Sequence, residues 1–217
     1  MKHAITLNRL FTVLLFSSIS ISSFSQTLKD VFNNPESPLL YLGIDFSKSR
    51  LMDAGDPAKT RDEYYGSIND LIVNEPDKFD LKGAFQKTSI KHDFTAVKKN
   101  NATANLDEIL STKPEDFNRF KESDITSIVN NLDLSGKEGI GLVFVMEAMR
   151  KIKKNSGIAI WVTLVDMKTK KILMTERMES EVTGGFGFRN YWASAIKKLI
   201  DAIEKKKYQE WKVKYGS

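Results

Sequence analysis

The segment of the chain whose residue types could best form a site is a glycine-rich stretch near its carboxyl end. We call residues 184–192 the glycine corner, which reads Gly184, Gly185, Phe186, Gly187, Phe188, Arg189, Asn190, Tyr191 and Trp192. Consecutive glycines ahead of a helix can direct backbone amides at an anion, and the arginine adds a positive charge. The spacing matches neither the dinucleotide-binding fingerprint nor the phosphate-binding loop. A structural turn is therefore the favoured interpretation, with an anion site as the alternative.

The aromatic residues of the glycine corner allow a further interpretation. If two of them are exposed, the corner is a patch for a protein partner, because aromatic side chains dominate the anchors of protein interfaces. The competing interpretation, slightly favoured, is that they close the end of the core. As a binding surface the corner would use Gly184, Gly185, Phe186, Gly187, Phe188, Arg189, Asn190 and Trp192.

Three carboxylates stand at the carboxyl ends of predicted strands, where open α/β sheets often place ligands; they are Asp45, Glu147 and Asp166. Antiparallel neighbours end on opposite edges of a sheet, so Glu147 and Asp166 are not expected to meet. Asp166 is predicted to be a turn residue whose side chain binds local amides. Glu147 interrupts an apolar strand and needs a buried partner, which favours an ion-paired scaffold over catalysis. Asp45 with Arg189 gives the alternative of a small-anion binder or hydrolase, provided that both line one pocket.

The composition gives little support to catalysis by a nucleophile or a transition metal. The chain of 217 residues has no cysteine and two histidines. His3 lies in a predicted leader, which leaves His92, a residue that we expect to be half-exposed on a strand. Neither a histidine cluster nor a thiolate can be built from this set. We therefore predict no metal, no cofactor and no enzymatic activity.

Residues 1–25 are predicted to be a secretory signal peptide. Lys2 and Arg9 precede an apolar segment, residues 10–21, and small serines follow at the positions that a signal peptidase reads. Cleavage before Gln26 would leave an exported chain, periplasmic or extracellular, without a membrane span. Loss of Lys2 and Arg9 lowers the net charge from +5 to about +3, which gives no case for nucleic-acid binding.

The rest of the chain, residues 26–217, is predicted to form a single α/β domain with its core at 39–207. About five strands covered by helices on both faces would make one mixed sheet; these strands are residues 39–46, 90–96, 140–146, 158–165 and 172–179. The strand at 140–146 is apolar on both parities and should be central. The last three strands form an antiparallel meander, the last of them nearer the sheet edge, and a long helix follows from about residue 190.

Local signals predict where the elements of the first half begin and end. Thr60 and Glu63 form a capping box at the start of a helix that ends before Pro76. Residues 27–37 are predicted to be irregular and residues 98–105 to be a polar loop.

Further signals concern the helices ahead of the central strand and at the end of the chain. Two short helices are predicted, one starting at Pro114 and one capped by Ser123. Near the end of the chain, the basic run at 205–207 is followed by aromatic residues. We favour the solvated, fraying end of the last helix over a contact with an anionic surface.

The order of elements and one hairpin resemble a known group of domains. Residues 161–173 match the unit "strand, Asp-x-x-Thr-Gly-Lys, strand", with Lys170 in place of the usual glycine. Over residues 39–207 the chain resembles the α/β domain of bacterial envelope proteins. That group includes the periplasmic domain of the curli secretion channel, the lipoprotein activators of penicillin-binding proteins and the N-terminal domain of the Tol translocation protein.

The segments 139–144 and 184–192 are also similar to a group of uncharacterised exported bacterial proteins. The resemblance to envelope domains implies protein binding and assembly, and it brings no catalytic residue. The resulting hypothesis is an exported module that binds another component of the cell envelope through the glycine corner and the adjacent helix. The alternatives are an anion-binding protein or hydrolase that uses Arg189 and Asp45, and a structural protein that associates with itself.

Overall fold

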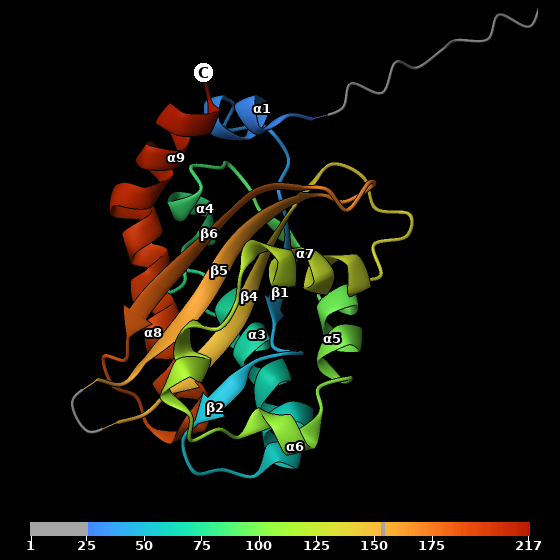
Figure 1. Cartoon of the computed structure of the whole chain (residues 1–217). Coiled ribbons are helices and arrows are strands. Elements are labelled where there is room, and N and C mark those ends of the chain that lie inside the picture. Colours follow the sequence, from blue (N-terminus) through green and yellow to red (C-terminus); the bar gives the residue numbers. More distant parts are fainter. Residues whose placement is uncertain (1–25, 153–154) are drawn as a thin grey trace, which may run out of the picture.

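One mixed sheet organises the fold, of which the computed structural model describes residues 26–152 and 155–217 (Figure 1). Its strands are β1 (Leu40–Asp45), β2 (Arg50–Met52), β3 (Lys91–His92), β4 (Ile140–Arg150), β5 (Gly157–Asp166) and β6 (Ile172–Glu181). They lie in the order β3-β1-β4-β5-β6, and β2 pairs with β4 outside that path. The predicted signal peptide lies outside the described residues.

The pairing directions confirm the predicted sheet. β1 runs parallel to β3 and β4, and β2 runs parallel to the last residues of β4. β4, β5 and β6 form the predicted antiparallel meander. The sheet is therefore mixed and of the α/β class, as the sequence predicts. β2 is a sixth strand that the sequence did not reveal, because three residues are too few to show a period.

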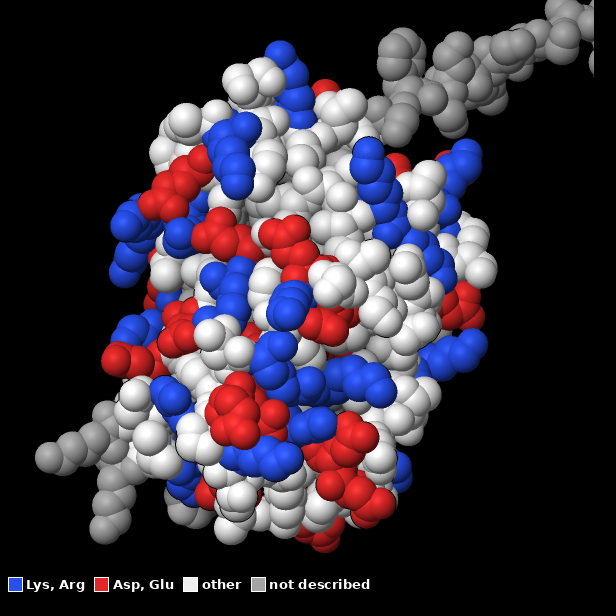
Figure 2. Space-filling view, viewed as in Figure 1, with Lys and Arg blue, Asp and Glu red and all other residues white. Residues whose placement is uncertain are grey.

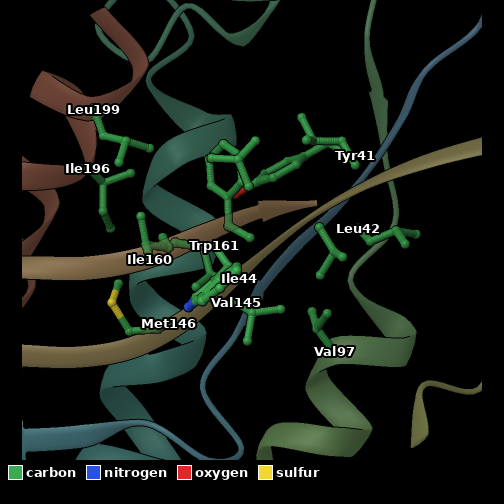
Figure 3. Close-up of a cluster of buried hydrophobic side chains, with 14 of the residues drawn as sticks. Tyr41, Leu42, Ile44, Val97, Val145, Met146, Ile160, Trp161, Ile196 and Leu199 are labelled. Atoms are coloured by element: carbon green, nitrogen blue, oxygen red, sulfur yellow. The ribbon is translucent and has the colours of Figure 1, made fainter. Parts of the chain in front are cut away.

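Burial follows the polarity of the strands. β4 and β5 are buried along almost their whole length, which is typical of strands that are apolar on both faces. β6 is an edge strand, and most of its residues are half-buried or exposed. Figure 3 shows Met146 of β4 and Ile160 of β5 beside Ile196 and Leu199 of the last long helix. Part of the core therefore lies between the sheet and this helix, as expected, and part lies under the helices between β3 and β4.

Helices cover both faces of the sheet (Figure 1). On one face, α3 (Tyr65–Asn74) and α8 (Gly187–Ala202) pack against each other, and α8 contacts β5 and β6. On the other face, the 3-10 helix η2 (Pro114–Asn118) contacts β4 and is followed by α7 (Glu122–Asn131), which contacts β6. The predicted apolar stripe of the last helix is buried; it consists of Trp192, Ile196, Leu199 and Ile203.

The segment 27–37 is helical at its start rather than irregular. α1 (Leu28–Asn33) begins with a capping box in which the side chains of Thr27 and Asp30 bind each other's backbone amides. The helix packs against the last helix of the chain. The prediction failed because a six-residue helix is held by such tertiary contacts rather than by its own propensity.

The end of the chain is an ordered helix and not a fraying one. The π-helix η3 (Ile203–Lys207) continues α8, and α9 (Tyr208–Tyr215) continues η3. Tyr208 and Trp211 are buried, and the Tyr208 hydroxyl donates to the carbonyl oxygen of Phe32 over 3.2 Å. The aromatic residues that follow the lysines therefore anchor this segment. None of the helices within the described ranges is long and apolar enough to cross a membrane.

The helix before Pro76 starts earlier than the capping box at Thr60 and Glu63 predicts. Asp56 is the actual N-cap, because its side chain accepts from the amide of Lys59 over 3.1 Å. The chain then passes through α2 (Pro57–Lys59) and the π-helix η1 (Thr60–Tyr64) into α3. Thr60 is buried inside the helix, so the proposed cap was wrong, while the predicted end before Pro76 is confirmed.

The region after β1 contains more helix than its polar sequence predicts. The strand predicted at 90–96 is limited to β3, an edge strand of two residues. The first half of the loop predicted at 98–105 belongs to α5 (Thr95–Asn101), whose last two asparagines are buried, while residues 102–105 form no helix or strand. Their amides bind the end of β1, so these polar residues belong to the core and not to a loop.

The remaining helices are short. α4 (Leu81–Ala84) and α6 (Leu106–Ile109) lie in the connections around β3 and α5. η2 starts at Pro114 as predicted. α7 starts at Glu122, and its start is held by the Asp124 carboxylate, which accepts from the amide of Lys121 over 2.7 Å, so the predicted Ser123 cap was wrong.

Candidate functional site

The glycine corner joins β6 to α8 through backbone conformations that need glycine. The φ angles of Gly184, Gly185 and Gly187 are +134°, +127° and +77°. A Cβ atom on Gly185 would lie 2.5 Å from the carbonyl oxygen of Asn190. The Asn190 side-chain amide in turn donates to the carbonyl oxygen of Phe186 over 3.1 Å. These contacts fix the turn, so the corner is at least a structural element.

The aromatic residues of the corner divide between the core and the surface. The Trp192 side chain is 1% exposed, whereas the Phe186 side chain is 96% exposed. Phe188 is half-buried and stacks on Tyr64 with 4.2 Å between ring centroids. Tyr191 is also half-buried. Phe186 is thus the one corner aromatic that is fully exposed, so the condition of two exposed aromatics is not met, and the favoured interpretation, that the set closes the end of the core, holds for the other three.

A second group of exposed apolar residues lies beside the corner, at the carboxyl ends of β2 and β4. Leu110 and Ile152 are 37% and 52% exposed. Lys151 links this group to the corner, because its Nζ lies 3.2 Å from an Asp53 carboxylate oxygen and 5.4 Å from the centroid of the Tyr191 ring. We call the glycine corner together with Lys151, Ile152 and Leu110 the carboxyl rim.

The carboxyl rim contains a hollow of about 680 Å³. Most of its lining is apolar, and Arg150, at the end of β4, brings a positive charge to it. The lining consists of Met52, Asp53, Ala54, Leu110, Ser111, Thr112, Pro114, Arg150 and Ile152. Open α/β sheets place ligands at the carboxyl ends of their strands, which is where this hollow lies. No pattern in the sequence predicts this hollow.

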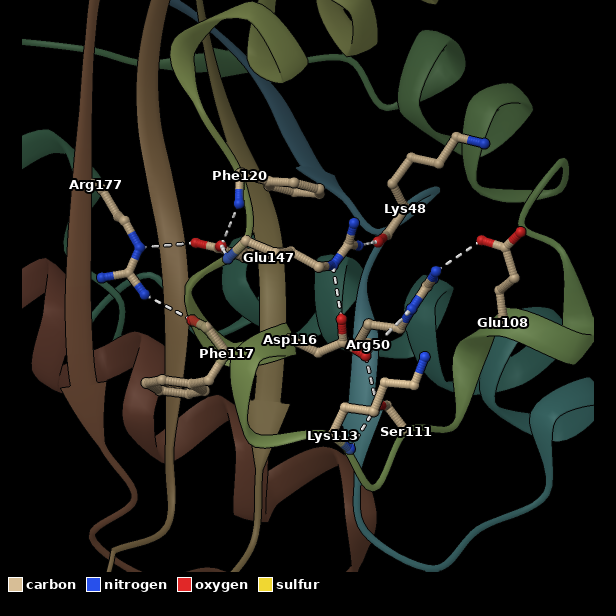
Figure 4. Close-up of polar contacts among 11 residues, drawn as sticks. Lys48, Arg50, Glu108, Ser111, Lys113, Asp116, Phe117, Phe120, Glu147 and Arg177 are labelled. Atoms are coloured by element: carbon tan, nitrogen blue, oxygen red, sulfur yellow. Dashed lines mark hydrogen bonds and ion pairs between the residues drawn. The ribbon is translucent and has the colours of Figure 1, made fainter.

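Glu147 is the centre of a buried polar network on the η2 face of the sheet (Figure 4). A β-bulge between Met146 and Ala148 leaves Glu147 unpaired in the ladder. Its carboxylate accepts from Arg177 Nε over 2.8 Å, from Trp161 Nε1 over 3.2 Å and from two backbone amides that follow η2. The expected ion-paired scaffold is thus confirmed, and it ties β4, β5 and β6 to η2.

The network extends toward β2 through charged residues that the sequence analysis did not identify. Arg50 lies 2.7 Å from Glu108 and 3.9 Å from Asp116, and Arg119 lies 3.9 Å from Asp116. On the face shown in Figure 2, acidic and basic side chains of the described chain are interleaved in this way. One signal was available for Arg177, because a charge facing inward from an edge strand needs a partner.

Asp45 is enclosed at the end of β1. Its carboxylate accepts from the backbone amide and hydroxyl of Ser47 over 2.9 and 2.6 Å and from the Asn100 amide over 2.6 Å. Burial raises the pKa of Asp45 above its ordinary value, against the effect of these donors. Arg189 is exposed at the start of α8, and no hydrogen bond or ion pair between the two is found within the described ranges.

The other candidate residues have local roles. Asp166 accepts from the amide and hydroxyl of Thr169 over 2.8 and 2.9 Å, which confirms it as a turn residue. It pairs with Ile140 at the start of β4, so it lies at the opposite end of the sheet from the carboxyl rim. Lys170 takes the usual glycine conformation of this turn, with φ +58°. His92 lies on β3 as expected but is exposed rather than half-exposed, with 5.2 Å between the centroids of its ring and the Phe94 ring.

No group of three or more histidine, cysteine, aspartate or glutamate side chains that could hold a metal ion is found in the part of the chain that the structure describes. The carboxylates singled out in the sequence are bound by donors of the chain itself. What the arrangement offers chemically is an exposed aromatic side chain, an apolar hollow and an arginine.

Comparisons with known proteins do not place the chain in a family. No protein-family model matches it, and no curated protein gives a significant match. Among solved structures, the C-terminal domain of LpoB from Salmonella enterica matches 71% of this chain and 96% of that domain, with 10% sequence identity and a TM-score of 0.25. A likeness of this degree carries no argument about function, so the resemblance to envelope domains stays an expectation from the sequence.

Proposed function

We propose that the chain is an exported, non-enzymatic module of the bacterial cell envelope that binds a protein partner through the glycine corner. The observation that carries this proposal is the Phe186 side chain, which is 96% exposed. Burial of such a side chain in an interface would contribute about 2 kcal/mol. Because glycines and the Asn190 amide already fix the corner, little ordering remains to oppose binding.

The three carboxylates at strand ends are bound within the chain itself, which supports a role without catalysis. A general acid or base must lie within hydrogen-bond reach of a substrate. Glu147 and Asp45 are buried and bound by donors of their own chain, and Asp166 holds a turn. Arg189 is exposed beside Phe186 and would add a charge-assisted contact to an acidic group of the partner.

Site-specific photo-crosslinking tests the contact surface. A photoreactive phenylalanine analogue replaces Phe186 in cells that produce the full chain. The matched control carries the same analogue at Val213, which is apolar and 71% exposed on α9. We expect a discrete adduct with another envelope protein from position 186 and none from position 213. Equal adduct patterns at the two positions, or an adduct of two copies of this chain, would contradict the proposal.

Export is tested separately by the mass of the mature protein. Cleavage before Gln26 predicts a chain that starts at this residue and lies outside the cytoplasm. Ser25→Tyr places a large residue where the peptidase requires a small one, so the precursor should accumulate. Mature chain of the same mass from both forms would show that the leader is processed elsewhere.

A further inference from the structure

The hollow of the carboxyl rim is walled by apolar side chains that would otherwise be expected inside a protein. Leu110 and Ile152 line it from two different loops, and both are exposed. Met52 forms the inner wall, where it packs against a small buried cluster that contains Phe117 and Ala148. Apolar groups that converge on one concave surface are the usual environment of a small-molecule site.

Arg150 supplies the hollow with a charge that its surroundings do not neutralise. Its guanidinium carbon lies 3.8 Å from the centroid of the Phe117 ring, and its Nε is buried without a hydrogen-bond partner. In the described part of the chain no carboxylate lies within ion-pair distance of Arg150, whereas Arg50 and Arg177 each have two. A cation held against an aromatic ring beside apolar walls attracts an anion more strongly than one in open water.

The neighbouring acidic group does not supply that anion. Asp53 lines the same hollow, but its carboxylate is engaged by Lys151 over 3.2 Å. Asp116, the next acid along the network, lies 3.9 Å from both Arg50 and Arg119.

Glu179 and Glu181 border Arg150 in a second hollow. However, they pair with Arg177 and Lys198, respectively, over 2.6 Å each. The charge of Arg150 is therefore left for a ligand.

We propose that this hollow binds a medium-chain aliphatic monocarboxylate. The carboxylate would receive two parallel hydrogen bonds from the Arg150 guanidinium, the geometry that arginine prefers with this group. The aliphatic tail would lie against Met52, Leu110 and Ile152. A volume of about 680 Å³ is within the range of small-ligand sites and holds a chain of about eight carbons.

Titration of the mature chain with sodium octanoate, followed by amide chemical shifts in NMR spectra, tests the proposal. 1-Octanol is the matched ligand, because it has the same tail without the charge. We expect shifts centred on Met52, Leu110 and Ile152, and octanoate should bind at least about tenfold more tightly than octanol. Equal affinity for both ligands, or shifts centred elsewhere, would overturn the proposal.

A pair of arginine variants keeps the result interpretable. Arg150→Leu retains an apolar lining and should remove the preference for octanoate while leaving weak octanol binding. Arg61→Leu removes an arginine that pairs with Asp62 away from the hollow, so the tenfold preference should persist. Unchanged octanoate affinity in Arg150→Leu would refute the assignment. These outcomes are independent of crosslinking at position 186, so either proposal can fail without the other.

Discussion

Glu147 and Arg150 belong to the same strand, β4, but the charge of Glu147 is paired inside the protein and the charge of Arg150 is not. Glu147 is fully buried, and its carboxylate accepts hydrogen bonds from Trp161 and Arg177 as well as from backbone amides. The Arg150 side chain lies against Phe117 and receives no counter-ion among the described residues. Over three residues the strand thus passes from a closed polar network to the open carboxyl rim.

The difference separates residues that hold the fold from residues that can hold a partner. A buried charge with a complete set of donors has no capacity left for a ligand, so Glu147 is part of the scaffold. An unpaired charge and exposed apolar groups retain that capacity, and they gather at the carboxyl rim. Glu147 is therefore assigned to the scaffold, and Arg150, three positions later, is the candidate for ligand binding.

The largest effect is expected from breaking the closed network. Glu147→Leu would leave the Arg177 guanidinium, which is 20% exposed, without its buried partner. Removal of one member of a buried ion pair typically costs about 3 to 5 kcal/mol. We expect a decrease of about 4 kcal/mol in the free energy of unfolding, measured by urea denaturation.

The double variant Glu147→Leu with Arg177→Leu controls for this interpretation. It replaces both charges by apolar groups, and a buried pair treated in this way often loses little stability. We expect the double variant to recover part of the stability lost by the single one, but not all of it, because Trp161 Nε1 and two backbone amides still lack their acceptor. A loss below about 1 kcal/mol in Glu147→Leu would show that the network is not scaffold.

A smaller effect is expected at the glycine corner, where the backbone and not an ion pair holds the rim in place. Gly185→Ala places a side chain 2.5 Å from the Asn190 carbonyl oxygen in a backbone region that favours glycine, so a loss of about 3 kcal/mol is expected. Gly184→Ala has a similar φ but open space around the new Cβ, and it should cost about 1 kcal/mol. Thermal and urea unfolding of both variants measure the difference. Equal losses would mean that the close approach at Gly185 does not constrain the corner.

Periodicity was sufficient to predict the part of the fold that is buried on both faces. The run at 140–146 identified β4 because no polar residue interrupts either face, and the stripe through Trp192 identified α8. Short elements escaped, since β2 has three residues and α1 depends on contacts with the end of the chain. Asn100 and Asn101 were misplaced because their polarity suggests a loop while their amides complete the end of β1.

The candidate site was only partly accessible from the sequence, for a physical reason. The glycine corner could be recognised because positive φ angles require glycine over a short stretch. Which of its aromatic residues would be exposed depends on packing against Tyr64, which is distant in sequence. The hollow beside Arg150 is formed by β2, β4 and the segment near Leu110, which are distant in sequence, so no local sequence pattern predicts it.

The ion pair of Asp93 with Lys137 is intermediate between the buried, paired Glu147 and the unpaired Arg150, because it is paired but only partly buried. Asp93 bonds with the Lys137 ammonium and accepts from the Thr95 amide over 2.9 Å, and its side chain is 32% exposed. The bond with Lys137, followed by those with Thr95, lowers the pKa of Asp93 to about 2. An acid whose pKa is lower in the folded state stabilises the fold above its unfolded pKa, near 4, and this contribution is lost as the pH falls through 2.

Lys137→Met should therefore show the smallest and the most pH-dependent effect. At pH 6 we expect a loss of about 0.5 to 1 kcal/mol in the free energy of unfolding, because solvent screens a partly exposed pair. Between pH 4 and about pH 2 the difference from the wild type should shrink toward zero as Asp93 takes up its proton. Urea titrations at several pH values measure this, with Lys171→Met, an exposed lysine in the turn after Asp166, as the variant that should follow the wild type throughout. A difference that stays constant down to pH 2 would assign the effect of Lys137 to packing instead of charge.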